Sequence, residues 1–404
     1  MTEGLEVLQA LPDTPERTQQ ELLLHLTLGP ALVNTRGPAA PEVERVYVRA
    51  SALCRQLGDT RQLFSVLWGL WYAHLMRGEL PQSWVLGEEL LDLAQRLQDP
   101  ILFLEAHGAL GPALFWLGEL ALAHTQLQQA VALYDPQHHH THALRYGRDS
   151  GIFCHSLGAV NLWLLGYPDQ ARQWSDEALG WARALAHPFT LQQNLLFAVL
   201  LQQLMGQAVI AQEHLETQLA LCTEHEFVHY LGWGTLMRGW SLATQGQVVK
   251  GIAQMRQGIA TWRTTGARAG EPWMLALLAE ACGRAGQVEE GLGALCEALE
   301  LMQTTQDRVY EAEVYRLQGE LLLQQSTAQQ SEAAASLQRA LDVAHRQEAK
   351  SLELRAAMSL SRLWQQQGKQ AKARALLAPV YGWFTEGFDT ADLQEARTLL
   401  EELT

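Results

Sequence analysis

The sequence predicts an all-α solenoid of about nine helix pairs followed by a C-terminal capping helix. The first observation is a series of turns at nearly constant spacing, where one helical pattern ends and the next begins. We place these turns near Gly37, Gly78, Gly118, Gly166, Gly206, Gly246, Gly286, Ala328 and Gly368. The second is a small residue five positions after most turns: Ser83, Ala123, Ala171, Ala211, Gly251, Gly291, Ala333 and Ala373. A turn glycine takes positive φ without steric cost, and a small side chain lets two paired helices approach closely.

The helices are expected in pairs around these turns. Prolines at 100 and 136 follow predicted helices and mark their ends, because proline cannot continue the hydrogen-bonding pattern. Four regular pairs are expected between Gly151 and Asp307. The other expected helices are 16–34 and 42–57, 62–77 and 82–97, 101–117 and 120–134, 309–325 and 331–347, 351–367 and 371–384, and finally 389–403 with Asp389 or Thr390 as N-cap.

Small residues also recur seven positions before and twelve positions after the turns. Examples are Gly111, Ala159, Gly239 and Ala279 before them, and Ala130, Ala178, Gly258 and Ala298 after them. With the turn and the fifth position, this pattern resembles the tetratricopeptide repeat (TPR), whose usual period is about 34 residues. The resemblance implies a right-handed superhelix. The step here is mostly 40 residues, which implies longer helices or linkers.

A closer resemblance covers nearly the whole chain. Four phrases, at 12–16, 315–323, 350–358 and 381–390, look like those of one bacterial group of signalling proteins. In that group a class III adenylate/guanylate cyclase or similar effector and a predicted ATPase precede C-terminal repeats. The resemblance reaches only the repeat part. It implies a sensing region that regulates an ATPase or cyclase effector.

We divide the chain into a partial repeat or N-terminal cap (1–15), the solenoid (16–388) and a capping helix (389–404). Residues 1–11 look like the end of a helix whose partner is missing, which suggests a truncated or excised chain. The alternative is that this segment is itself the cap that hides apolar surface.

Composition excludes several function classes. The net charge of −15 argues against nucleic acid or an anionic membrane as the main partner, since phosphate binding needs clustered Lys and Arg. No apolar run is expected to reach transmembrane length, and no signal peptide is recognisable. We therefore expect a cytoplasmic protein. The five cysteines form no C-x-x-C pair and are expected to be buried and reduced.

The step from Gly118 to Gly166 is 48 residues, so about eight extra residues fall around 137–150. Insertions in solenoids map to loops that often lie on the binding face. Four histidines here (138, 139, 140 and 142) suggest metal, but no Cys, Asp or Glu within the run completes a site. Contact with a ligand or partner is expected instead from Arg145, Tyr146 and Arg148.

His225-Glu226-Phe227-Val228-His229 matches H-E-x-x-H, the zinc metalloprotease pattern. That chemistry requires both histidines on one face of a continuous helix. The repeat register places His225 at a helix end, so the motif should straddle a boundary. The enzymatic alternative is a zinc-dependent hydrolase that uses this motif. Our own prediction is that the chain has no catalytic residues, no bound metal and no cofactor. No P-loop pattern is present.

Ligand contacts are expected on the first helix of each pair, which in TPR folds lines the concave surface. The inward positions there carry many large aromatic residues, a class enriched at binding hot spots. The candidates are Trp68, Tyr72, Phe115, Trp163, Trp233, Trp240 and Trp273, with Phe153 beside them and Arg238, Arg284 and Glu105 as polar neighbours. The alternative for each is ordinary packing between repeats.

The function predicted from the sequence is a non-catalytic scaffold that binds a protein, a peptide or a small molecule in its concave groove. The other alternative is a purely structural module whose half-repeat at residues 1–11 pairs between chains.

Overall fold

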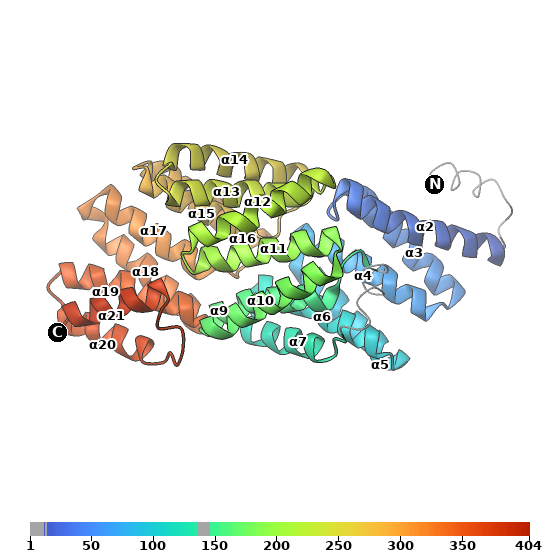
Figure 1. Cartoon of the computed structure of the whole chain (residues 1–404), viewed down its shortest axis with the longest axis horizontal. Helices are drawn as coiled ribbons and strands as arrows, with labels where there is room; N and C mark the ends of the chain where they lie inside the picture. Colours follow the sequence, from blue (N-terminus) through green and yellow to red (C-terminus); the bar gives the residue numbers. More distant parts are fainter. Residues whose placement is uncertain (1–11, 13, 136–145) are drawn as a thin grey trace.

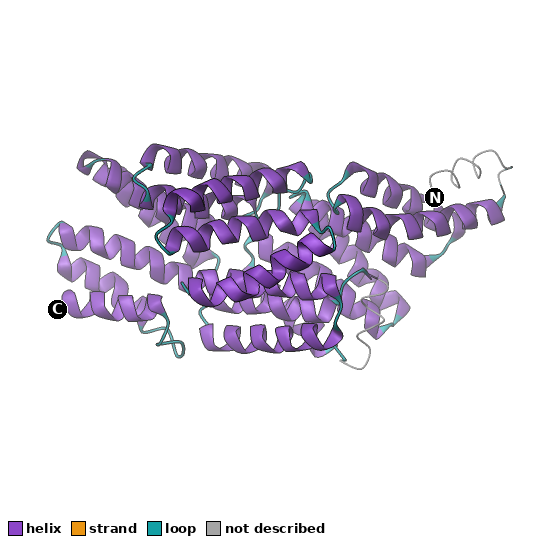
Figure 2. Ribbon diagram, turned by 45° about the horizontal axis from the view of Figure 1, so that its top comes forward, coloured by secondary structure: helices purple, strands orange, loops and turns teal. Residues whose placement is uncertain are grey.

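The computed structural model describes residues 12, 14–135 and 146–404, and every regular element in these ranges is a helix (Figures 1 and 2). Nine antiparallel pairs follow one another along the described chain and are followed by a last single helix. The first five pairs are α2 (Pro15–Arg36) and α3 (Pro41–Leu57), α4 (Thr60–Met76) and α5 (Leu80–Leu97), α6 (Pro100–Leu117) and α7 (Leu120–Ala132), α9 (Ser150–Leu165) and α10 (Pro168–Leu185), and α11 (Pro188–Leu204) and α12 (Ala208–Glu224).

The remaining pairs are α13 (Val228–Thr244) and α14 (Val248–Thr264), α15 (Glu271–Arg284) and α16 (Val288–Thr305), α17 (Glu311–Gln325) and α18 (Gln330–Arg346), and α19 (Lys350–Gln366) and α20 (Gln370–Tyr381), before α21 (Ala391–Glu402). The all-α repeat prediction is therefore confirmed. Helix ends differ from the expected ones mostly by one to three residues, which is the usual uncertainty of such boundaries.

The predicted turns form as expected. All eight turn glycines have positive φ, and a short 3-10 helix (Thr327–Gln329) makes the degenerate turn at Ala328. The small residues permit close packing within pairs. In α13 and α14 a Cβ atom on Gly239 would lie 2.6 Å from the carbonyl oxygen of Gly251, too close for any side chain at that position.

Successive turns of the superhelix are in contact with each other. The N–H of Arg268 donates to the carbonyl oxygen of Met76 (2.8 Å), and the N–H of Arg308 donates to that of Trp116 (2.8 Å). Each of these contacts joins a helix pair to the fifth pair after it. The hydroxyl of Ser351 in α19 repeats this relationship one step further along, because it donates to the carbonyl oxygen of Trp163 in α9 (2.5 Å).

These contacts fill much of the space along the superhelix axis. Buried side chains therefore pack between neighbouring helix pairs and also between successive turns of the superhelix. Figure 1 shows α9 beside the C-terminal helices and α4 beside α11. One large cluster of buried apolar side chains extends from Leu114 to Ala356 and also includes Ala39. A second cluster, from Leu22 to Tyr146, fills the N-terminal pairs.

Of the described helices, α6 alone has the length and apolar composition of a segment that crosses a membrane, contrary to our expectation that no run would. Within the protein, 72% of that helix is buried. This burial is typical of a core helix.

Candidate ligand-binding groove

The seven aromatic residues predicted to line the concave surface are all buried, with exposed fractions between 0% and 6%. The contacts between superhelical turns cover them. Trp273 stacks on Tyr310 with ring centroids 4.5 Å apart and donates its indole N–H to Gln203 (3.3 Å). Trp68 and Tyr72 lie together, with centroids 5.7 Å apart. Their role in binding stays a prediction. Trp240 borders a groove lined by charged side chains, whereas Trp68, Tyr72 and Trp233 border smaller pockets.

That groove is lined mainly by first helices of the C-terminal pairs, the helices expected to form the concave surface, and has a volume of about 320 Å³. Its walls come from α11, α13, α15, α17, α19 and α21, and we call it the concave groove. Four arginines and four carboxylates line it together with Trp240: Arg284, Arg316, Arg355, Arg362, Glu280, Glu313, Asp392 and Glu395.

The floor of the groove is a network of largely buried ion pairs. Arg316 binds Glu313 (Nη2 to Oε1, 2.6 Å), and Arg355 binds Asp392 (Nε to Oδ2, 2.8 Å). Burial alone would raise the pKa of Glu313, but the charges of Arg316 and Arg355 outweigh it and hold that pKa below its usual value. Burial alone would lower the pKa of Arg355, but the carboxylates of Asp392 and Glu313 raise it. Glu313 and Arg355 therefore stay charged near neutral pH.

The rim carries more exposed pairs. Arg284 and Glu280 pair on α15 (2.6 Å), with side chains 43% and 29% exposed. Arg362 of α19 pairs with Glu395 of α21, with side chains 36% and 58% exposed. Such rim pairs have solvent access and can exchange partners with a ligand at little cost, because exposed ion pairs are weak.

Sequence reasoning found Trp240 and Arg284 but missed most of the groove. A signal existed, because Arg355 and Arg362 occupy the same inward positions before Gly368 that the aromatic residues occupy elsewhere. The other two predicted polar neighbours lie outside the groove. Arg238 donates to Gln254 (3.0 Å) across the helix pair, and Glu105 is fully buried and accepts from Ser150 (2.7 Å).

Two residues predicted to lie in an exposed insertion loop are instead inside the protein. Tyr146 is 8% exposed and Arg148 is 2% exposed. Tyr146 packs on Trp68 with ring centroids 5.1 Å apart. Arg145, the four histidines of the loop and residues 1–11 lie outside the described residues.

The H-E-x-x-H motif straddles two helices, as the repeat register predicts. Helix α12 ends before His225, Glu226 has a positive φ of 56°, and His229 lies in α13. The residues therefore do not share one helical face. Among the described residues no group of three His, Cys, Asp or Glu side chains is placed to hold a metal ion.

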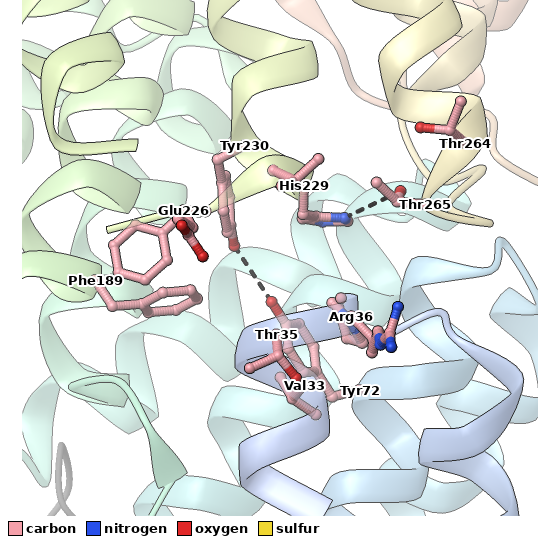
Figure 3. A pocket seen from close by; sticks show the side chains of 14 residues that line it. Val33, Thr35, Arg36, Tyr72, Phe189, Glu226, His229, Tyr230, Thr264 and Thr265 are labelled. Atoms are coloured by element: carbon pink, nitrogen blue, oxygen red, sulfur yellow. Dashed lines mark hydrogen bonds between the residues drawn. The ribbon is translucent and has the colours of Figure 1, made fainter. Parts of the chain in front are cut away.

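A pocket of about 180 Å³ lies between this region and the turn at Gly37 (Figure 3). His229 faces Thr265 across it, and the hydroxyls of Tyr72 and Tyr230 meet at its floor, 3.2 Å apart. Burial lowers the pKa of His229 to about 3, so the imidazole is neutral at physiological pH.

Comparison with known proteins supports the fold. No protein-family profile matches the chain. A protein of Rhizobium meliloti (strain 1021), described as uncharacterized, is 23% identical over 355 residues, which are 87% of this chain. The chain spans about a third of that relative's length (34%).

Two solved structures are similar to the chain, and the first of them shows the same architecture. A Rap protein complexed with competence and sporulation factor superimposes with a TM-score of 0.61 at 11% identity, over 95% of this chain and 99% of that one. A signal transduction ATPase with numerous domains and a tetratricopeptide repeat sensor, from Pyrococcus horikoshii, has a TM-score of 0.42 at 12% identity, over 89% and 55% of the two chains. At these identities the likeness concerns the fold, and the chain is an all-α, TPR-like helical-repeat solenoid.

Proposed function

We propose that the chain is a non-catalytic binding scaffold that takes a peptide, or an extended segment of a partner protein, in its concave groove. The proposal rests on one observation: the arginines at the floor of the groove are held in ion pairs away from solvent, whereas the ion pairs at its rim are exposed and can exchange partners. The side chains of Arg316 and Arg355 are 13% and 14% exposed and pair with Glu313 and Asp392, while those of Arg284 and Arg362 are 43% and 36% exposed. A ligand with charges of both signs would find complementary partners along the groove without a large rearrangement.

The fold similarity supports the same class of ligand. The Rap protein of similar fold was crystallised with a competence and sporulation factor. Trp240 supplies a rigid aromatic surface at the groove edge, of the kind enriched where proteins bind partners.

The finer proposal is that ligand binding regulates a bacterial ATPase or nucleotide-cyclase effector in the cytoplasm. It rests on the four phrases that resemble such signalling proteins.

The experiment selects peptides from a random library on the wild-type protein and then measures their affinity for charge-swapped variants. In the groove variant Arg362→Glu is combined with Glu395→Arg, which preserves an ion pair at the rim but reverses its direction. The control combines Arg397→Glu with Glu401→Arg, an exposed pair on α21 outside the groove. We expect selected peptides to lose at least about tenfold in affinity, or about 1.4 kcal/mol, with the groove variant only. Unchanged affinity, or no selection above background, would refute the proposal.

A further inference from the structure

Arg148 is a buried cation surrounded by aromatic rings. It lies just before α9, next to the N-cap residue Asp149, and only 2% of it is exposed. Its guanidinium carbon lies 3.9 Å from the ring centroid of Phe153 and 5.2 Å from those of Trp68 and Tyr72. Aromatic faces attract a cation, but they accept none of its five N–H donors in a strong hydrogen bond.

The guanidinium also lacks an anionic partner in the described part of the chain. Its Nε and Nη2 atoms are buried without a hydrogen-bond acceptor there. The two nearby carboxylates have other roles: Asp149 caps α9 through the N–H of Ile152 (2.9 Å), and Glu105 accepts from Ser150 (2.7 Å). Burying a charge without a partner is costly, so a site that keeps such a charge calls for an anion.

Arg148 borders a small chamber of about 50 Å³. Most of the chamber wall is apolar, with Leu196, Phe197, Leu200 and Trp233 among its residues. The Oε1 atom of Gln193, another wall residue, is buried and has no donor in the described part of the chain. The chamber thus combines one cation, one open acceptor and an apolar surface.

We propose that this chamber binds a small monocarboxylate with a short apolar chain, the carboxylate on Arg148 and the chain against the apolar wall. A guanidinium matches a carboxylate in a bidentate geometry, and small-molecule sites combine apolar walls with a few polar groups. The volume corresponds to roughly four water molecules, which limits the ligand to a similar number of non-hydrogen atoms. Tyr72 and Tyr230 line both this chamber and the pocket of Figure 3, and their hydrogen-bonded hydroxyls, 3.2 Å apart, lie between the two.

The experiment compares propionate with propionamide, its neutral analogue of nearly the same shape, and with chloride at equal ionic strength. Thermal unfolding is followed against concentration, and the affinity is measured by calorimetry. A ligand that binds only the folded protein raises the unfolding temperature in a saturable way. We expect propionate to raise the unfolding temperature in this way, and propionamide and chloride to leave it unchanged. Hexanoate should raise it less than propionate, because the chamber is small.

The Arg148→Gln variant should lose the propionate response. The matched control is Arg339→Gln, because Arg339 also lies over an aromatic ring, 4.7 Å from the centroid of Tyr315, but is exposed. If Arg148→Gln does not fold, Leu200→Trp fills the chamber while Arg148 is retained, and it should also lose the response. Equal responses to propionate and chloride, no response in the wild type, or a response retained in Arg148→Gln would overturn the proposal. None of these outcomes depends on peptide binding in the concave groove.

Discussion

The N–H of Arg308, in the linker before α17, donates a hydrogen bond of 2.8 Å to the carbonyl oxygen of Trp116 in α6. This bond joins two helix pairs that are five repeats apart. In most solenoids each repeat contacts only its neighbours. Here the linkers of the C-terminal half also bind helix ends of the N-terminal half, and this contact buries the aromatic residues on the superhelix axis.

The contacts between successive superhelical turns distinguish two kinds of glycine in the short turns that join paired helices. Gly166 and Gly246 have similar φ values, 96° and 89°, so alanine strains the backbone similarly at both. A Cβ atom on Gly166 would lie 2.8 Å from the Cβ atom of Lys350 and 2.6 Å from the ring of Trp383, whereas Gly246 has nothing within 4 Å. We expect Gly166→Ala to destabilise the protein by about 1–3 kcal/mol more than Gly246→Ala, measured by urea unfolding. Equal losses of stability in the two variants would mean that the superhelical turns separate in solution.

The concave groove should contain one arginine that matters for stability and one that does not. Arg355 binds Asp392 (2.8 Å) and donates to the carbonyl oxygen of Leu204 (2.5 Å) from a nearly buried position. Its replacement in Arg355→Met leaves Asp392 without its cation and Glu313 with Arg316 alone, and it should cost about 3–5 kcal/mol.

Arg362→Met is the matched control, because Arg362 is at the exposed rim. Its loss should cost at most about 1 kcal/mol. Urea unfolding of both variants measures the difference. A similar stability for the two variants would contradict the buried network.

His229 should make the protein less stable in acid. Its pKa is about 3 in the folded protein, because burial disfavours the charged form, and an unfolded histidine titrates near 6.5. The neutral folded form therefore contributes stability above pH 6.5, and this contribution is lost as the pH falls from 6.5 toward 3. Between pH 7 and 5, His229→Phe should lose about 1–2 kcal/mol less stability than the wild type. His345→Phe, at an exposed histidine, should behave like the wild type in the same urea titrations.

Thiol labelling should detect one of the five cysteines in the folded protein. Cys54, Cys154, Cys222 and Cys282 are buried, and only Cys296 is exposed, which corrects the expectation that all five are buried. Burial also raises the pKa of Cys54 to about 11 and that of Cys222 to about 12, so neither forms the reactive thiolate near neutral pH. Ellman's reagent should label about one thiol per native chain and none in Cys296→Ser. Rapid labelling of further thiols in native protein would show that the core opens.

The helix pairs could be predicted because their determinants are local. A turn such as Gly246 and small residues such as Gly239 and Gly251 carry a pattern that one sequence shows directly. The pitch of the superhelix leaves no such pattern in the sequence. It is set by contacts of backbone atoms, such as those of Met76 and Trp116, which every residue type has. For this reason Trp233 and Trp273 could be placed on inward helix faces, while their burial could not be predicted.

The candidate site was predicted only in part for a related reason. Trp240 and Arg284 stood out as an aromatic and a charged residue on first helices. Arg148 was placed in an exposed insertion, because its burial depends on aromatic residues more than 70 positions earlier in the sequence. Neither the apolar chamber nor the pairing of Arg355 with Asp392 could be read from spacing alone.

The contact of each pair with the fifth pair after it also constrains how this molecule can change its number of repeats. A solenoid held together by neighbours alone tolerates the insertion or deletion of one repeat, because every remaining interface is preserved. In this chain, deletion of a middle pair would bring Met76 opposite the wrong linker and shift every contact between turns by one step. Evolution by single-repeat duplication is therefore obstructed in the middle of the chain, and additions at the ends of the superhelix are the changes its geometry permits.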